Sequence, residues 1–362
     1  MTYLDMSQAR FQDRRADANA PALGHVRRKS RVVLGVALLA MLPLAATADP
    51  RSSATTVNYA TSFGNFGRDA YVYVAIERGY FERAGFDVKV TPGTGSVDNI
   101  KLVAAGRLDY TPVDVGALVV TRVNEALPVR VVAVVHQNTM SALFTLEESG
   151  IAQPKDLEGK TFADSPASTV RVLFPLYAKK AGIDASKVRI RDAAPPALPA
   201  LLASKQVDAI GQFSVGVPLV QTAAGGRKIR TFKYSKVLPG LLGIGIVASD
   251  EKIRTRPAEV RAFTRALLRG LQWSIDNPGE AGNILKKYNP LADPVVAAKE
   301  LRIMKFFVEN RLTRARGNGL GYIDIGKMAS TISVIRNGFG IAKPLPVTEL
   351  YTDVAVPARR TR

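Results

Sequence analysis

Few residues in this sequence could perform covalent or acid–base chemistry. The chain of 362 residues has no cysteine and two histidines, His25 and His136. The lack of cysteine excludes a disulfide, a thiol nucleophile and a zinc site with cysteine ligands. A serine–histidine mechanism would depend on His136, and no Gly-x-Ser-x-Gly elbow, phosphate loop or dinucleotide fingerprint accompanies it. We therefore expect no catalytic residue, no metal ion and no cofactor.

Residues suited to binding a small molecule follow the first predicted strand. The segment from Ser62 to Asp69 contains two phenylalanines, Phe63 and Phe66, whose rings offer flat faces to a ligand. Its glycines allow close approach of the backbone, and Arg68 or Asp69 could recognise charge. The same segment could equally be a loop with one buried phenylalanine and a helix cap at Asp69.

Other loops at the ends of predicted strands carry hydroxyl and amide groups. Gly95 and Ser96 follow the second strand, and the segment 164–169 opens a helix in the second half of the chain. Free N–H groups at a helix start suit an anion, although serine, threonine and aspartate are also the commonest helix caps. His136 ends an apolar strand and is either a structural histidine or a ligand contact. The predicted ligand-binding residues are Phe63, Gly64, Asn65, Phe66, Arg68, Asp69, Gly95, Ser96, Asp114, His136, Asn138, Ser165, Ser168, Thr169, Gln212 and Phe213.

Short β-branched segments that alternate with helical segments must position these loops. The first part of the chain predicts strands at 57–61, 87–91, 109–113 and 129–135 and helices at 71–81, 97–105 and 115–126. The pattern then restarts, with strands at 161–163, 188–191, 207–210 and 229–232 and helices at 170–181 and 198–204. Such alternation is typical of βαβ units. We therefore expect an α/β fold with mostly parallel sheets flanked by helices, and ligand loops at the carboxyl ends of the strands.

The order of these segments also predicts the domains. The apolar segment 241–248 is expected to return the chain to the first lobe, and an amphipathic helix is predicted over 257–277. The expected division is a first lobe of residues 55–138 and 240–350, a second lobe of residues 139–239, and a flexible basic tail at 351–362.

The first 48 residues have the pattern of an export signal. Basic residues at 27–31 precede an uncharged segment, 32–48, that ends in Ala46-Thr47-Ala48. The segment is shorter than the roughly 20 residues that cross a bilayer, so we expect a signal peptide cleaved after Ala48 and a periplasmic protein. This cleavage would remove seven basic and three acidic residues, which lowers the net charge from +19 to +15.

The remaining positive charge is spread along the chain. It occurs mostly as pairs such as Lys179-Lys180 and Lys286-Lys287, and no finger, helix-turn-helix or ribonucleoprotein signature is present. We interpret it as solvated surface charge and expect no nucleic-acid partner. A binder of nucleic acid or of a membrane surface would instead lose affinity steeply as salt increases.

Three segments carry a resemblance to a known family. They are YVYVAIERGYFERAGFDVKV at residues 71–90, PKDLEGKTFA at 154–163 and PAEVRAFTRALLRGLQWSIDNPGEAGNIL at 257–285. Together they resemble the periplasmic solute-binding proteins of ABC transporters of the nitrate, taurine, sulfonate and thiamine-precursor group. The resemblance implies a type II fold with two lobes, a hinge of two segments and a ligand cleft between the lobes. It also implies transient docking of both lobes to a membrane permease with its ATPase, and we expect a monomer.

The predicted function is capture of a small organic or oxyanionic solute for import, without enzymatic activity. Arg68 and the hydroxyl-rich helix starts slightly favour a sulfonate, taurine or nitrate. The phenylalanines of the first loop, with Asp69 and Asp114, favour a flat amine-bearing heterocycle such as a thiamine-precursor pyrimidine. A rival hypothesis is an enzyme of the pyrimidine-synthesis type that uses His136 with Asp114. The yeast relative with that activity has a cysteine-rich motif, whereas this chain has no cysteine.

Overall fold

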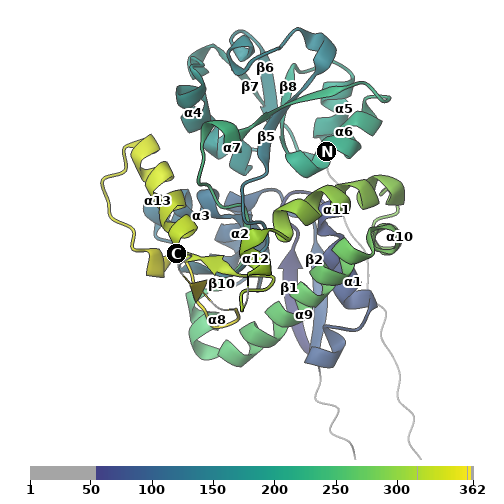
Figure 1. Ribbon diagram of the computed structural model, residues 1–362, viewed down its shortest axis with the longest axis vertical. Helices are drawn as coiled ribbons and strands as arrows, with labels where there is room; N and C mark the ends of the chain where they lie inside the picture. The colour runs from purple at the N-terminus through teal and green to yellow at the C-terminus, as the bar shows by residue number, and fades with distance from the viewer. Residues whose placement is uncertain (1–53, 316, 357, 360–362) are drawn as a thin grey trace, which may run out of the picture. The chain divides into compact units, whose positions relative to one another are not determined.

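Strands from the first and last parts of the chain form two neighbouring sheets (Figure 1). The computed structural model describes residues 54–315, 317–356 and 358–359, so the predicted signal peptide lies outside the described residues. β1 (Thr55–Ala60) pairs in parallel with β2 (Phe86–Thr91). A bridge between Tyr59 and Tyr110 links β1 to the next sheet, whose strands are β3 (Thr111–Asp114), β10 (Ile244–Ser249) and β4 (Val129–Val134). The helices that follow β1, β2 and β3 are α1 (Ala70–Glu77), α2 (Ser96–Ala104) and α3 (Val115–Glu125).

The middle of the chain forms a separate five-stranded sheet with the order β7-β6-β8-β5-β9. Its strands are β5 (Ser141–Leu146), β6 (Thr161–Asp164), β7 (Arg189–Asp192), β8 (Ala209–Phe213) and β9 (Ile229–Lys233). The helices of this part are α4 (Thr169–Ala181), α5 (Leu198–Ala203), α6 (Val217–Ala223) and α7 (Tyr234–Val237). The sequence pattern predicted the strands and helices of this region except β5, α6 and α7. β5, with the sequence SALFTL, contains a single β-branched residue, Thr145, so it gives a weak strand signal.

Most strands run parallel to one another, as expected, and the exceptions are β5 and β10. Strands β1 and β2, and strands β7, β6 and β8, are parallel to one another, as βαβ units require. However, β5 runs antiparallel to both β8 and β9, and β10 runs antiparallel to both β3 and β4. Each of these strands enters its sheet directly from a crossover segment rather than after a helix, so it arrives in the opposite direction.

Two crossover segments connect the sheets and are hydrogen bonded to each other. The first follows β4 at residues 135–140, and the second precedes β10 at residues 238–243. The Gly243 N–H donates to the His136 carbonyl oxygen over 3.1 Å, and the Thr139 N–H donates to the Leu241 carbonyl oxygen over 3.1 Å. A Cβ atom at Gly243 would lie 2.4 Å from the Asn138 carbonyl oxygen, so only glycine allows this approach.

The C-terminal helices complete the side of the molecule that holds β1. They are α8 (Asp250–Thr255), α9 (Pro257–Asp276), α10 (Pro278–Tyr288), α11 (Pro294–Val308), α12 (Arg311–Arg314) and α13 (Ile325–Phe339). The predicted helix 257–277 is confirmed as α9, and its apolar stripe is buried. Phe263 from this stripe stacks on Tyr110 with ring centroids 4.0 Å apart. Within the described residues, no helix is both long and apolar enough to span a membrane.

The C-terminal segment does not begin as a free tail. The Val131 N–H donates to the Leu350 carbonyl oxygen, and the Thr352 N–H donates to the Val131 carbonyl oxygen. Val356 is buried, and a short strand, β12 (Ala358–Arg359), pairs in parallel with β11 (Ile323–Asp324). The prediction of a flexible segment from residue 351 is therefore wrong for residues 351–356, because this segment pairs along β4 and packs on the core.

Candidate functional site

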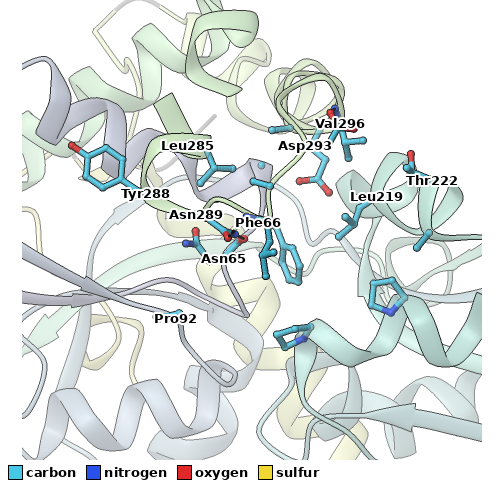
Figure 2. A pocket seen from close by; sticks show the side chains of 18 of the residues that line it. Asn65, Phe66, Pro92, Leu219, Thr222, Leu285, Tyr288, Asn289, Asp293 and Val296 are labelled. Carbon is cyan, nitrogen blue, oxygen red and sulfur yellow. Dashed lines mark hydrogen bonds between the residues drawn. The ribbon is translucent and has the colours of Figure 1, made fainter. Parts of the chain in front are cut away.

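The sheets form two groups: the β1-β2 and β3-β10-β4 sheets are the first group, and the five-stranded sheet is the second. A cavity of about 670 Å³ lies between these two groups (Figure 2). This volume is within the range of small-molecule sites. One wall comes from the loop after β1, the opposite wall comes from α5 and α6, and α10 and α11 with their connecting loop form the third side. The lining residues are mainly apolar. They are Asn65, Phe66, Gly67, Pro92, Pro196, Pro199, Ala200, Leu219, Thr222, Ala223, Leu285, Tyr288, Asn289, Leu291, Ala292, Asp293, Val296, Ala297 and Glu300.

A buried arginine supports the aromatic part of this wall. The Arg68 guanidinium carbon lies 4.9 Å from the ring centroid of Phe66 and 4.9 Å from that of Phe213. Arg68 Nη2 also donates to the Phe63 carbonyl oxygen over 2.6 Å, and the Phe63 ring contacts the Phe213 ring edge to face. Arg68 is only 3% exposed. Its charge is therefore held between a ring from the loop after β1 and a ring from β8, and does not project into the solvent.

Two carboxyl groups accompany this arginine. Asp69 Oδ2 lies 3.9 Å from Arg68 Nε and accepts a hydrogen bond from the Phe66 N–H. Glu300, on α11, is 1% exposed. Burial raises the pKa of Asp69 above its usual range, and burial likewise raises the pKa of Glu300 to about 7, although Arg68 opposes both shifts. Arg68 therefore shares its buried position with two carboxyl groups, whose ionised forms offset its charge.

His136 is buried and neutral. Burial, with a smaller contribution from the nearby charge of Arg68, lowers the pKa of His136 to about 3. Neither ring nitrogen has a hydrogen-bond partner among the described residues. A neutral imidazole carries one donor and one acceptor, so it can bind a polar ligand atom but offers no charge at neutral pH.

The two predicted hydroxyl-rich loops contact each other. Ser165 Oγ donates to the Thr94 carbonyl oxygen over 2.8 Å, and Thr169 Oγ1 donates to Ser96 Oγ over 3.0 Å. A Cβ atom at Gly95 would lie 2.4 Å from the Ala167 carbonyl oxygen, and φ of Gly95 is +148°. These loops join the first and second groups of sheets directly, and their hydroxyl groups already have protein partners.

Two buried aspartates cap or flank these loops. Asp114 caps α3, since its Oδ1 accepts from the Gly116 N–H over 2.8 Å. Asp164 ends β6, and its Oδ2 has no hydrogen-bond partner among the described residues. Burial raises the pKa of each carboxyl to about 7. Both groups therefore gain protons more readily than an exposed aspartate does.

The predicted site residues fall into four groups. Asn65 and Phe66 line the cavity, and Gly64 lies under the Phe66 ring. Phe63, Arg68, Asp69, His136, Gln212 and Phe213 are buried, and Arg68 links Phe66 to Phe213. Gly95, Ser96, Asp114, Ser165, Ser168 and Thr169 form the loop contact or cap helices. Asn138 is exposed, and its Oδ1 accepts from Lys327 Nζ over 2.7 Å. Ligand contact by these residues stays a prediction.

Several lining residues carried no sequence signal. Leu219 lies on α6, Asn289 follows α10, and Glu300 lies on α11. The sequence of a helical segment indicates which face of the helix is apolar. It does not indicate that the helix packs against the loop after β1. For the part of the chain that the structure describes, no cluster of three His, Asp or Glu residues could hold a metal ion.

The sequence between residues 68 and 281 matches the family model described as "NMT1/THI5 like", which spans more than half of the chain. The chain belongs to the NMT1/THI5-like family. This membership confirms the family resemblance of the three sequence segments.

Several known proteins resemble this chain along most of its length. It is 28% identical over 257 residues to the formylaminopyrimidine-binding protein of Halalkalibacterium halodurans, covering 68% of this chain and 76% of that protein. It is 28% identical over 295 residues to the riboflavin-binding protein RibY of Chloroflexus aurantiacus, covering 79% and 81%. The periplasmic aliphatic sulphonate binding protein SsuA of Escherichia coli superimposes with a TM-score of 0.60 at 13% identity, covering 85% and 95%. The last likeness confirms the α/β periplasmic binding protein fold.

Proposed function

We propose that this protein is the periplasmic solute-binding component of an ABC import system and that its ligand is a flat, nitrogen-bearing heteroaromatic molecule. The observation that carries the ligand class is the charge of the cavity wall. The charged side chains that line the described cavity are Asp293 and Glu300, and both are carboxyl groups. A sulfonate or nitrate would meet these groups without a basic residue on the wall, which is unfavourable in a partly buried site.

The position of Arg68 supports the same conclusion. From the sequence alone, Arg68 was an argument for an anionic ligand. Its guanidinium is instead sandwiched between two rings, bonded to the Phe63 carbonyl oxygen and flanked by Asp69. Arg68 therefore stabilises the wall behind Phe66 through its Nη2 hydrogen bond to the Phe63 carbonyl oxygen, and its Nε lies 3.9 Å from the Asp69 carboxylate.

The apolar lining and the Phe66 ring suit a planar aromatic ligand. Aromatic stacking and a few oriented hydrogen bonds can supply the 8 kcal/mol or so that a micromolar dissociation constant requires. The two curated relatives at 28% identity are named for formylaminopyrimidine and riboflavin, both nitrogen heteroaromatics. Their names support the ligand class proposed for this chain.

We propose that the two crossover segments act as the hinge that import requires. They connect the two groups of sheets at residues 135–140 and 238–243, and ligand contacts from both sides of the cavity would favour a closed arrangement. In the proposed cycle, a monomer closes on its solute in the periplasm and docks transiently to a permease and its ATPase, without catalysing a reaction. The proposed lobes are those expected from the sequence, 55–138 with 240–350 and 139–239.

Replacing Phe66 by alanine should weaken ligand binding with little loss of stability. Phe66 lines the cavity and is only partly buried, so we expect the dissociation constant to rise about tenfold or more while the free energy of unfolding changes by about 1 kcal/mol or less. Isothermal titration calorimetry with riboflavin and with formylaminopyrimidine measures the first quantity, and urea denaturation measures the second.

A matched control is Phe306→Ala, because Phe306 is 79% exposed and does not line this cavity. The control should bind as the unaltered protein does. Equal affinity in the Phe66→Ala variant would remove the first-strand loop from the ligand site.

A further inference from the structure

Glu300 is a buried carboxyl group in the wall of the cavity. It lies in the middle of α11 and is 1% exposed, although it is one of the residues that line the cavity. Glutamate is almost never fully buried unless it is paired. Its position therefore requires partners that offset the cost of burying it.

The two oxygens of this carboxyl group have different surroundings. The backbone N–H groups of Gly67 and Arg68 hydrogen bond to the carboxyl group. Oε2 is the oxygen on this side, since a Cβ atom at Gly67 would lie 2.6 Å from it. Oε1 is also buried but has no hydrogen-bond partner among the described residues. A buried acceptor without a partner is costly, and a ligand N–H group would remove that cost.

The other acidic side chain of the cavity wall, Asp293, already accepts hydrogen bonds from the protein backbone. Asp293 Oδ1 accepts from the Val295 and Val296 N–H groups and caps α11. Asn65, across the cavity wall, also has a buried oxygen without a partner. The buried side-chain atoms of the wall that lack a partner among the described residues, Asn65 Oδ1 and Glu300 Oε1, are thus both acceptors when Glu300 is ionised, and acceptors require donors from the ligand.

We propose that Glu300 is the specificity-determining residue of this site, and that its Oε1 atom accepts a hydrogen bond from an exocyclic amino group of the ligand. The inference rests on the proposed function, since it assumes a heteroaromatic ligand in this cavity. It predicts that the protein prefers an amino-substituted ring to the same ring with an oxo group, because an oxo group would place a second acceptor against Oε1.

The variant Glu300→Gln should reverse this preference. The N–H groups of Gly67 and Arg68 require an oxygen, so the glutamine carbonyl would take the place of Oε2. The NH₂ group would then replace Oε1 and present a donor to the ligand. A reversal of preference differs from a loss of folding, which would abolish binding of both kinds of ligand.

Cytosine and uracil are suitable probes. Cytosine carries an amino donor at C4 beside the acceptor N3, whereas uracil carries an oxo acceptor at C4 beside an N3–H donor. Calorimetric titrations at pH 8.5 keep Glu300 ionised, since burial raises its pKa to about 7. We expect the unaltered protein to bind cytosine about 10- to 100-fold more tightly than uracil, and the variant to bind uracil more tightly. The exposed Glu280 on α10 provides the control Glu280→Gln, which should keep the original preference.

Each outcome decides a separate point. Reversed preference in Glu300→Gln alone supports the inference. Equal binding of the two bases by the unaltered protein, or an unchanged preference in the variant, overturns the role of Glu300 but leaves a heteroaromatic binder. Binding of neither base up to its solubility limit, with saturable binding of an alkanesulfonate, overturns the proposed ligand class and the inference with it.

Discussion

Replacing Arg68 by methionine is expected to lower the free energy of unfolding by about 3–5 kcal/mol, because it removes the cation from a buried charge cluster. Arg68 is 3% exposed, lies 3.9 Å from the Asp69 carboxylate and also counters the charge of Glu300. Methionine fills much of the same volume, so the loss would come from the charge and from the hydrogen bond to the Phe63 carbonyl oxygen. Urea denaturation at pH 8 measures the change, since Glu300, with a pKa of about 7, is mostly ionised there.

Arg78 provides the matched control for this substitution. Its guanidinium carbon lies 4.5 Å from the ring centroid of Trp273, but the side chain is exposed. Arg78→Met should therefore cost about 1 kcal/mol or less. A loss below about 1 kcal/mol in Arg68→Met would contradict the role given to Arg68 as the cation that holds the cavity wall together.

Stability should rise as the pH falls from 8 to about 5, by an amount on the order of several kcal/mol. Burial raises the pKa of Asp114, Asp164 and Glu300 to about 7 each. The folded protein therefore binds more protons than the unfolded chain between the usual carboxyl pKa and about 7. The stabilisation by these three groups is fully present below the unfolded pKa, near 4, and is lost as the pH rises through 7.

The titration of His136 lowers the stability as the pH falls, but this loss is smaller than the gain from the three carboxyl groups. Burial lowers its pKa to about 3, so the unfolded chain takes up one more proton on this residue as the pH falls below about 6.5. The three carboxyl groups take up more protons in the folded protein than the one histidine takes up in the unfolded chain. This holds until the pH is low enough to protonate the carboxyl groups of the unfolded chain as well. Urea midpoints between pH 5 and 8 measure the slope, and Asp164→Asn should flatten it. Stability that stays constant or increases from pH 5 to 8 would show that these carboxyl groups do not titrate as described.

The sequence predicted most secondary structure correctly because its elements follow simple periodic patterns. The helix at 257–277 alternates buried and exposed positions, and its prolines mark the starts of α9 and α10. The strand β5 was missed because its sequence, SALFTL, contains a single β-branched residue, Thr145, and so gives a weak strand signal. The antiparallel directions of β5 and β10 depend on how the crossover segments enter the sheets, which no local pattern encodes.

The candidate site was predictable on one side only. The loop after β1 stood out because aromatic, glycine and charged residues occur together there, and Asn65 and Phe66 do line the cavity. The third side comes from α10 and α11, more than 200 residues further along the chain. Glu300 has an ordinary helical context, in which a glutamate is expected to be exposed. Its burial arises from contact between α11 and the segment at Gly67, which only the tertiary structure reveals.

The hydroxyl-rich loops show why a local motif was ambiguous. Serine and threonine at a helix start satisfy the same N–H groups whether they act as caps or as part of an anion site. Ser168 accepts from the Val170 N–H and caps α4, and Thr169 bonds to Ser96 in the facing loop. The residues are therefore used in direct protein contacts, and the wall charge of the neighbouring cavity becomes the better guide to the ligand.

The central claim is that the protein binds a flat nitrogen heteroaromatic rather than a small anion, and ligand-induced stabilisation tests it most directly. The purified protein would be heated with formylaminopyrimidine, riboflavin, an alkanesulfonate, taurine or nitrate in separate samples. A ligand present at 100 times its dissociation constant adds about 2.7 kcal/mol of stability. We predict such an increase with at least one of the two heteroaromatic compounds and none with the three anionic or zwitterionic compounds. Stabilisation by a sulfonate, taurine or nitrate, with no effect of either heteroaromatic compound, would contradict the account.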